Sequence, residues 1–589
     1  MRRALWRALL AVTLLYGIGL LPWLSRADPA LTVLKARSAE RDPTPEVLAA
    51  IRAELGLDAG PLNLLGEWFG GLARGDAGRS WISGAEVTPA VVQALGASLL
   101  LMAAALVVAA LTAAAVCART LRLGARGRLE KRPGGGSAAA MVAALPEFLT
   151  ASVLAAVVGV QLGWLPALGW YGPRWMVLPA LALGLPAGAL LGRMLDDLLP
   201  GAFAEPWALA AAARGIPGRA TARRAVRRCI PGLLPNIGLF VVGLTGGAVA
   251  VEQIFDIPGL GRTTLQAALA QDLPVLQAGT LALVLLAALA GALARLAARL
   301  LIGPALRDGA LHSPHRPKPA APRRAPLLHG TLLLVVVALG LARDPLALDT
   351  GARLQPPSWA HPLGTDALGR DLLARIGHGA FTTLALAVAI SATALLTGVL
   401  LGLLPRLSGP LVDTVNAVPA VLAGLLVAGI AGSGAATPAL AVAAVAWVPL
   451  AAHTTALLEQ ERATTHITAT KGLGAGNAYL LRRELLPAVL PPVARHALLR
   501  LPAVALALTS LGFLGLGAQP PDPEWGLLLA ENQPYAERAP WAVLAPATAL
   551  ALLGALAVTA AGGVRRPRPF ARPVRQPKPA VAPTVGETV

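Results

Sequence analysis

The chain has 589 residues, of which 56% are hydrophobic and only 14% are charged, and its mean hydropathy is +0.64. An average soluble domain carries about 25% charged residues, so this composition excludes an ordinary soluble protein and indicates a membrane protein. The net charge of +19 comes from short arginine blocks between apolar stretches, which favours cytoplasmic loops and argues against a nucleic-acid partner.

Twelve apolar stretches are long enough to cross a lipid bilayer, which needs about 20 helical residues. They lie near residues 6–24, 94–118, 137–160, 175–195, 234–254, 277–302, 327–343, 379–404, 411–432, 436–457, 494–517 and 541–563. The sequence therefore predicts an all-α, polytopic membrane protein with about twelve transmembrane helices in two homologous six-helix halves.

The first stretch follows Arg2, Arg3 and Arg7, so it resembles a signal peptide as well as a first span. A cleavage site at Ser25 to Ala27 stays open, but we favour an uncleaved helix. Residues of about 26–93 mix acids and bases with apolar residues. This mixture predicts a small folded cap on the outer side, between the first and second spans.

Basic blocks predict the orientation, because positive charge is retained on the cytoplasmic side of short loops. Such blocks follow the second, sixth and twelfth stretches, around residues 119–132, 307–324 and 565–578. An even number of spans separates each block from the N-terminus. The sequence therefore predicts a multi-pass protein of the cytoplasmic (inner) membrane, with both termini, a Pro/Arg-rich linker over 307–326 and a disordered basic tail over 565–589 in the cytoplasm.

A similar loop recurs between the fourth and fifth spans of each half. Gly215 is followed by Arg223 and Arg224, and Gly474 is followed at the same spacing by an arginine pair, Arg482 and Arg483. Glycine admits the left-handed backbone of a tight reversal, so each loop is predicted to be a short helix, a glycine turn and a second short helix, closed by prolines, along the inner face. A merely basic anchor for lipid headgroups is the alternative.

The two loops resemble the cytoplasmic motif by which permeases of ATP-binding-cassette importers present a coupling helix to their ATPase. The first half, with GDAGRS at 75–80, LGWLP at 162–166 and VEQIFDIPGLGR at 251–262, is similar to the B-type permeases of dipeptide, oligopeptide and nickel importers. The second half, with HPLGTDALGRD at 361–371 and SLGFLGLGAQPPDPEWG at 510–526, is similar to their C-type partner. The resemblance implies a B-type half over 1–306 fused to a C-type half over 327–564.

This resemblance implies two ATPase subunits or domains and an extracytoplasmic solute-binding protein as partners, with peptides or a related small solute, nickel included, as cargo. The implied ATPase-coupling residues are Ala211, Arg214, Gly215, Arg223, Arg224, Ala469, Lys471, Gly474, Arg482 and Arg483. The implied residues of the face that receives the binding protein are Gly75, Arg79, Gly259, Gly261, Arg262, Gly364, Asp366, Arg370, Pro520 and Trp525. The acidic residue that often opens the cytoplasmic motif is replaced by Leu209 and Thr468.

Catalytic and metal-binding patterns are missing from the sequence. It has no GxxxxGK[ST] loop to hold nucleotide phosphates, and its two cysteines, Cys117 and Cys229, form no CxxC pair. We therefore expect no enzyme activity, cofactor or metal in this chain. For Glu147 and Glu252, acids in or near predicted spans, we favour a structural role over a substrate path. A secondary transporter with repeated halves and a membrane scaffold without transport remain alternatives.

Overall fold

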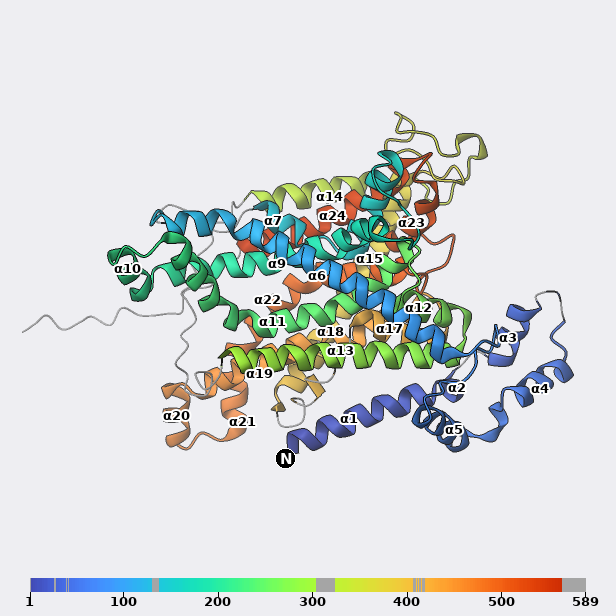
Figure 1. Ribbon diagram of the computed structural model, residues 1–589, viewed down its shortest axis with the longest axis horizontal. Helices are drawn as coiled ribbons and strands as arrows, with labels where there is room; N and C mark the ends of the chain where they lie inside the picture. The colour runs from blue at the N-terminus through green and yellow to red at the C-terminus, as the bar shows by residue number, and fades with distance from the viewer. Residues whose placement is uncertain are drawn as a thin grey trace, which may run out of the picture.

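The computed structural model describes residues 2–25, 28–38, 40, 42–129, 137–302, 324–405, 409, 411–412, 415 and 419–563. Within these residues the chain is helical, without a β-strand (Figure 1). Seven helices are long and apolar enough to cross a membrane, and four shorter apolar helices accompany them. Each of the twelve predicted stretches contains a helix, so the predicted polytopic all-α fold is confirmed.

The first half runs from the N-terminus to the end of the sixth span. Its helices are α1 (Arg2–Gly19), α2 (Leu21–Leu24), α3 (Pro29–Arg37), α4 (Pro45–Glu54), η1 (Leu57–Ala59), α5 (Pro61–Ala73), α6 (Val87–Ala125), α7 (Ser137–Val142), α8 (Glu147–Leu154), the π-helical η2 (Ala155–Gln161), α9 (Pro173–Phe203), α10 (Pro206–Ala213), α11 (Gly218–Ile254), α12 (Leu260–Ala270) and α13 (Leu273–Ile302).

The second half repeats this order without an N-terminal cap. Its helices are α14 (Ala325–Leu341), η4 (Thr350–Ala352), α15 (Leu372–Gly402), α17 (Ala420–Ala431), α18 (Ala436–Ala446), α19 (Val448–Arg462), α20 (Thr465–Gly472), α21 (Asn477–Tyr479), the π-helical η5 (Leu480–Leu485), α22 (Leu486–Phe513), α23 (Trp525–Asn532), η6 (Gln533–Tyr535) and α24 (Pro540–Gly563). The predicted tail over 565–589 and most of the predicted linker over 307–326 lie outside the described residues.

Two sequence-based boundaries were wrong. The third span is not one helix, because Pro146 caps α8 and separates it from α7. The second helix of each glycine-centred loop is not short, because α11 runs for 37 residues into the fifth span, and residues 477–513 do the same in the second half. The helices continue through Pro231, Pro491 and Pro492, since each proline removes only one backbone hydrogen bond within a packed bundle.

Glycines bring the second and fourth spans of each half into backbone contact. A Cβ atom on Gly188 of α9 would lie 2.5 Å from the backbone oxygen of Ala109 on α6. One turn away on either side, the nearest α6 atoms would lie 2.6 Å from a Cβ on Gly184 and 2.9 Å from one on Gly192. In the second half the glycines sit on the other helix, where a Cβ on Gly402 of α15 would lie 2.8 Å from the Ala451 oxygen on α19. Small residues at this spacing let helices pack closely in lipid.

The two halves pack against each other through the middle of the molecule. The rings of Phe148 on α8 and Phe513 on α22 have centroids 5.6 Å apart. The side-chain amide of Gln271, just after α12, donates to the Ala428 carbonyl on α17 at 2.9 Å. Apolar and polar contacts therefore both join the halves.

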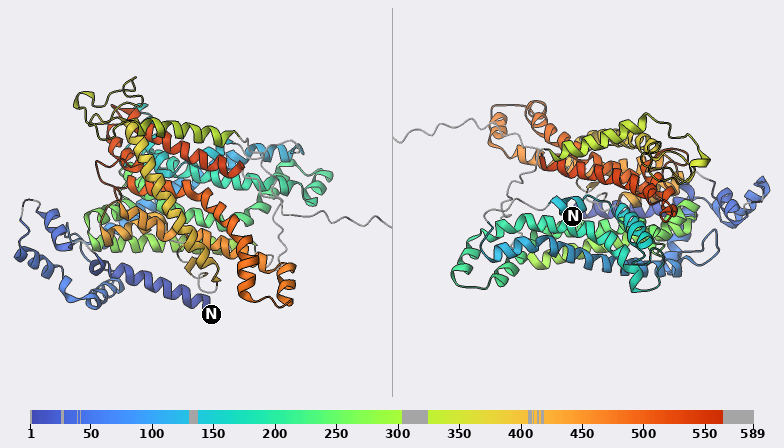
Figure 2. Two further views of the ribbon diagram at one scale, coloured as in Figure 1. Left: turned by 180° about the vertical axis from the view of Figure 1, so that it is seen from behind. Right: turned by 90° about the horizontal axis from the view of Figure 1, so that it is seen from above.

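Residues 28–73 fold into a helical cap that projects from one end of the bundle (Figures 1 and 2). Within the cap, Arg52 of α4 pairs with Asp28 at the start of α3, and Arg37 pairs with Glu54 at 2.9 Å. The cap is joined to the bundle where Gly19, at the end of α1, packs against Leu65 and Trp68 of α5. These contacts distinguish the segment from an extended linker.

Candidate functional site

The two repeated loops form the same turn at the end of the bundle opposite the cap (Figures 1 and 2). Gly215 has φ +70° and Gly474 has φ +92°. The amide of Gly215 donates to Ala212 O at 3.0 Å, and the next amide, of Ile216, donates to Ala211 O at 3.0 Å. This pair of bonds is a Schellman motif, which closes a helix through a left-handed residue.

The second loop repeats these bonds. The Gly474 amide donates to Lys471 O at 3.0 Å, and the Ala475 amide donates to Thr470 O at 3.3 Å. The predicted reversal at the two glycines is therefore confirmed in both halves. A Cβ atom added at either glycine would meet no other atom within 4 Å, so only the backbone conformation restricts side chains there.

Most residues predicted to couple to an ATPase lie on the surface at this end. The exposed ones are Arg214, Gly215, Arg223, Arg224, Ala469, Lys471, Gly474, Arg482 and Arg483. Ala211 is buried, with 4% of its surface exposed, so it supports the turn from within and does not present a contact surface. The two turns also expose large apolar side chains, Leu209 in the first and Leu473 in the second.

At the opposite end, the segment after α5 is fixed to the start of α13. A β-bridge joins Arg79 and Glu86, and Asp76 and Thr88 accept backbone hydrogen bonds within the same loop. The Ser80 hydroxyl donates to the Asp272 carboxylate, which also accepts from the Trp81 amide at 3.1 Å. This anchoring leaves Gly75 and Arg79 exposed.

The VEQIFDIPGLGR segment buries its acid. Glu252, at the end of α11, is 0% exposed and accepts a hydrogen bond from the Ser98 hydroxyl of α6 at 2.5 Å. It also accepts from the Arg262 amide at 3.0 Å, and the Leu260 amide donates to the Ser98 hydroxyl at 2.8 Å. The carboxylate therefore joins the ends of two spans to the N-terminus of α12.

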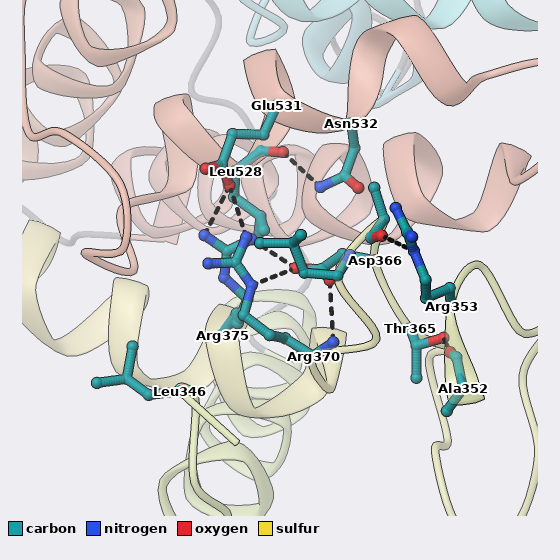
Figure 3. A network of polar contacts seen from close by, with 12 residues as sticks. Leu346, Ala352, Arg353, Thr365, Asp366, Arg370, Arg375, Leu528, Glu531 and Asn532 are labelled. Carbon is teal, nitrogen blue, oxygen red and sulfur yellow. Dashed lines mark hydrogen bonds and ion pairs between the residues drawn. The ribbon is translucent and has the colours of Figure 1, made fainter. Parts of the chain in front are cut away.

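The matching region of the second half contains a network of buried charges (Figure 3). Arg375, at 0% exposure, pairs with Asp366 at 2.8 Å and with Glu531 of α23 at 2.7 Å. Arg370 pairs with Asp366 at 2.8 Å and with Glu531 at 3.4 Å. Two cations and two anions therefore fasten the loop before α15 to α23.

The predicted binding-protein face is only partly a surface. Gly75, Arg79 and Pro520 are exposed and Arg262 is partly buried, whereas six others, namely Gly259, Gly261, Gly364, Asp366, Arg370 and Trp525, are buried. These six residues have little surface to offer a partner in this structure, and their part in receiving a binding protein stays a prediction. They are buried because they pack the outer loops onto the spans: Trp525, for example, donates from its ring to Ile376 O at 2.8 Å.

Sequence reasoning missed the partners of these residues. Arg375, Glu531 and Asp272 belong to no predicted site. Arg375 stands just before the predicted stretch at 379–404, and an arginine so close to a span was a signal of a buried ion pair. The carboxylate of Asp371 was missed as well, and it binds the Arg343 guanidinium at 2.8 Å and the His361 ring at 2.9 Å.

A cavity of about 290 Å³ lies within the second half, lined by residues of α15, α18, α22 and the loop before α23. Leu386 of α15 and Leu508 of α22 line it, together with Thr383, whose hydroxyl has no hydrogen-bond partner in the described part of the chain. Glu524, at the N-cap of α23, also lines it and accepts from the Gly526 and Leu527 amides at 3.0 and 2.8 Å. Burial raises the pKa of the Glu524 carboxyl to about 7 despite these two donors.

Glu147 lies at the start of α8, where a Cβ on Gly247 of α11 would come within 3.1 Å of its side chain. It is partly buried near the contact of Phe148 with Phe513. Among the described residues, no group of three His, Cys, Asp or Glu side chains could hold a metal ion. Cys117 and Cys229 are both buried and are not joined in a disulfide.

A protein-family comparison matches the chain twice. The family of the binding-protein-dependent transport system inner membrane component aligns with residues 137–303 and again with residues 389–566, which together exceed half of the chain. Each aligned segment contains one of the two glycine turns. The family similarity therefore occurs once in each half, as the glycine turn does.

Individual relatives point the same way. A di/tripeptide transport system permease protein of Pseudomonas aeruginosa is 38% identical over 196 residues, which cover 31% of this chain and 65% of the relative. A probable D,D-dipeptide transport system permease protein of Escherichia coli is 33% identical over 216 residues, 35% of this chain and 72% of the relative. A glutathione transport system permease protein of Pectobacterium atrosepticum is 36% identical over 186 residues, 30% of this chain and 61% of the relative.

Proposed function

Because the chain belongs to the family of binding-protein-dependent transport system inner membrane components, we propose that it supplies both permease halves of an ATP-driven peptide importer. The observation that carries this proposal is the double family match with one Schellman turn in each matched segment. The named relatives transport peptides or glutathione, which favours a short peptide over nickel as cargo.

In this proposal the chain opens and closes a path while partner subunits hydrolyse ATP. Two ATPase subunits bind the exposed turns at Gly215 and Gly474 and move them, and a solute-binding protein delivers the peptide to the opposite end. The turns differ in their side chains: Leu209 corresponds to Thr468 and Ala212 to Lys471 when the glycines are aligned. Each turn therefore prefers a different ATPase subunit.

Reconstitution tests the proposed function. The chain is purified with candidate ATPase subunits and a candidate solute-binding protein of the same organism. The complex is placed in proteoliposomes and supplied with a radiolabelled dipeptide. We expect uptake that requires ATP inside the vesicles and the binding protein on the other side. Uptake driven by an ion gradient without any ATPase would instead identify a secondary transporter, and bound partners without uptake would identify a scaffold.

The orientation of the chain gives a prediction for labelling in intact cells. In a variant without Cys117 and Cys229, a cysteine at position 313 of the predicted linker is expected to resist an impermeant maleimide, because the linker faces the cytoplasm. A cysteine at Trp359, which is fully exposed in the loop before α15, serves as the outer control and is expected to react. Rapid labelling at position 313 with protection at 359 would reverse the orientation.

The cap gives a second prediction. Deleting residues 46–60 removes α4 and η1, including Arg52 and Glu54, which hold α4 to α3. Because the cap lies at the end opposite the glycine turns, we expect at least a severalfold loss of dipeptide uptake while the ATPases still copurify with the chain. Full uptake by a stably inserted deletion variant would show that the cap does not help to receive the binding protein.

A further inference from the structure

The outer end of the fifth span meets a short helix in each half, and the two contacts correspond residue by residue. A Cβ on Gly261 of α12 would lie 2.7 Å from Val249, and a Cβ on Gly526 of α23 would lie 2.0 Å from the Thr509 oxygen. The two halves can therefore be aligned with Val249 opposite Thr509 on the spans and Gly261 opposite Gly526 on the short helices. Three residues beyond Val249 and Thr509 stand Glu252 and Gly512, and two residues before the loop glycines stand Gly259 and Glu524.

A glutamate and a glycine face each other in both contacts, but on exchanged sides. A Cβ on Gly259 would lie 2.2 Å from the Glu252 carboxyl carbon, and a Cβ on Gly512 would lie 2.2 Å from the Glu524 Oε2. The first half thus has its acid on the span and its glycine on the loop, and the second half has the reverse. Each glycine gives the space that the opposing carboxylate fills.

Both carboxylates bind the same place on the short helix. Glu252 accepts from the Arg262 amide at 3.0 Å, and Glu524 accepts from the corresponding Leu527 amide at 2.8 Å. A carboxylate at a helix N-terminus satisfies free amides and interacts favourably with the helix dipole. The two halves therefore achieve one local structure with acids from different positions of the chain.

The second span differs between the halves in the same way. In the first half the Ser98 hydroxyl binds Glu252, whereas in the second half Thr383 and Gly512 line the same cavity and the buried Thr383 hydroxyl has no partner among the described residues.

We propose that Glu252 and Glu524 are equivalent positioning residues, and we call each glutamate–glycine contact the clamp of its half. Glu252 hydrogen-bonds the fifth span to α12, whereas Glu524 caps α23 and holds it to the fifth span by packing against Gly512. The same fifth-span helices begin at the glycine turns, since α11 starts three residues after Gly215 and residues 477–513 start three residues after Gly474. A 37-residue helix is about 55 Å long. Each carboxylate therefore makes the short helix follow a movement that begins at the ATPase end.

The test exchanges the two residues in the second half. Glu524→Gly and Gly512→Glu are expected to lower the thermal unfolding midpoint of the purified complex, one by losing the acid and the other by crowding Glu524. The double variant restores one acid and one glycine, now in the arrangement of the first half and beside the cavity that Thr383 also lines. We expect it to recover the midpoint and to bring ATP-driven dipeptide uptake to within threefold of the parent, where each single change loses at least tenfold.

Two further variants separate the clamp from general damage. Glu524→Gln keeps one acceptor oxygen and is expected to fall between the parent and Glu524→Gly. Asp522→Gly removes an exposed acid of the same loop and is expected to change neither measurement. The proposal is overturned if the double variant has an unfolding midpoint no higher than that of the less stable single variant. If the single variants fail to assemble, a double variant that also fails to assemble overturns it equally.

The transport measurement rests on the proposed importer function, but the unfolding midpoint does not. Recovery of the midpoint without any ATP-driven uptake in the parent would reject the importer and leave the clamp in place. Recovery of the midpoint without recovery of uptake would reduce the clamp to a structural contact and reject its role in positioning.

Discussion

Replacing Gly474 by valine is expected to reduce ATP-driven transport at least tenfold, and Gly215→Val is expected to do the same. At φ +92° and +70°, a β-branched residue strains the backbone by about 1–3 kcal/mol, and the Schellman hydrogen bonds cannot form without that conformation. The chain relieves this strain by opening the turn. The exposed surface offered to the ATPase then loses its shape.

Measurements on the purified complex check this expectation through ATPase retention and transport-coupled hydrolysis. Gly476→Val is the matched control, because Gly476 also has free space around it but an ordinary φ of −73°. Gly474→Asn is expected to retain more activity than Gly474→Val, since asparagine tolerates the left-handed region better. Wild-type stimulated hydrolysis and transport in both valine variants would show that these turns are not the coupling elements.

Arg375→Met is expected to destabilise the second half by about 3–5 kcal/mol, because it leaves buried carboxylates without one of their two cations. Asp366 keeps Arg370, but Glu531 keeps only its longer contact of 3.4 Å to that residue. The outer loop then separates from α23. We expect loss of dipeptide uptake together with a lower thermal unfolding midpoint.

A graded series makes this prediction specific. Glu531→Gln is expected to destabilise the second half less than Arg375→Met does, since the Glu531 side chain is 21% exposed and water compensates part of the lost ion pairing. Arg353→Met is the control, because this exposed guanidinium donates only to the Ala367 carbonyl and joins no ion pair among the described residues. Equal midpoints for Arg375→Met and Arg353→Met would mean that the buried network does not stabilise the fold.

Local chemistry made much of the fold predictable. About 20 apolar residues must be helical in a bilayer, so twelve stretches predicted the helices, and glycine at a reversal predicted the positive φ of Gly215 and Gly474. The continuity of helices through prolines was harder to predict. Pro231 in α11 does not end the helix, because neighbouring elements hold it, and that support is invisible in the sequence.

The outer site was predicted in place but not in kind. The segments around Gly259, Asp366 and Trp525 do lie together at one end, yet their motif residues are buried, because those residues hold loops to spans. The pairing of Glu252 with Gly259 and of Gly512 with Glu524 is a three-dimensional contact between segments. No periodicity within either segment reports it.

The glycine contacts between the second and fourth spans determine which helices move together. Where Gly188 meets Ala109 through backbone atoms, no rotamer change can absorb a displacement, so α6 and α9 travel as one rigid body. Phe148 and Phe513 meet through rings, which slide and reorient at little cost. The contact between the halves is therefore where we expect the molecule to open, with each glycine-packed pair of spans moving as a unit.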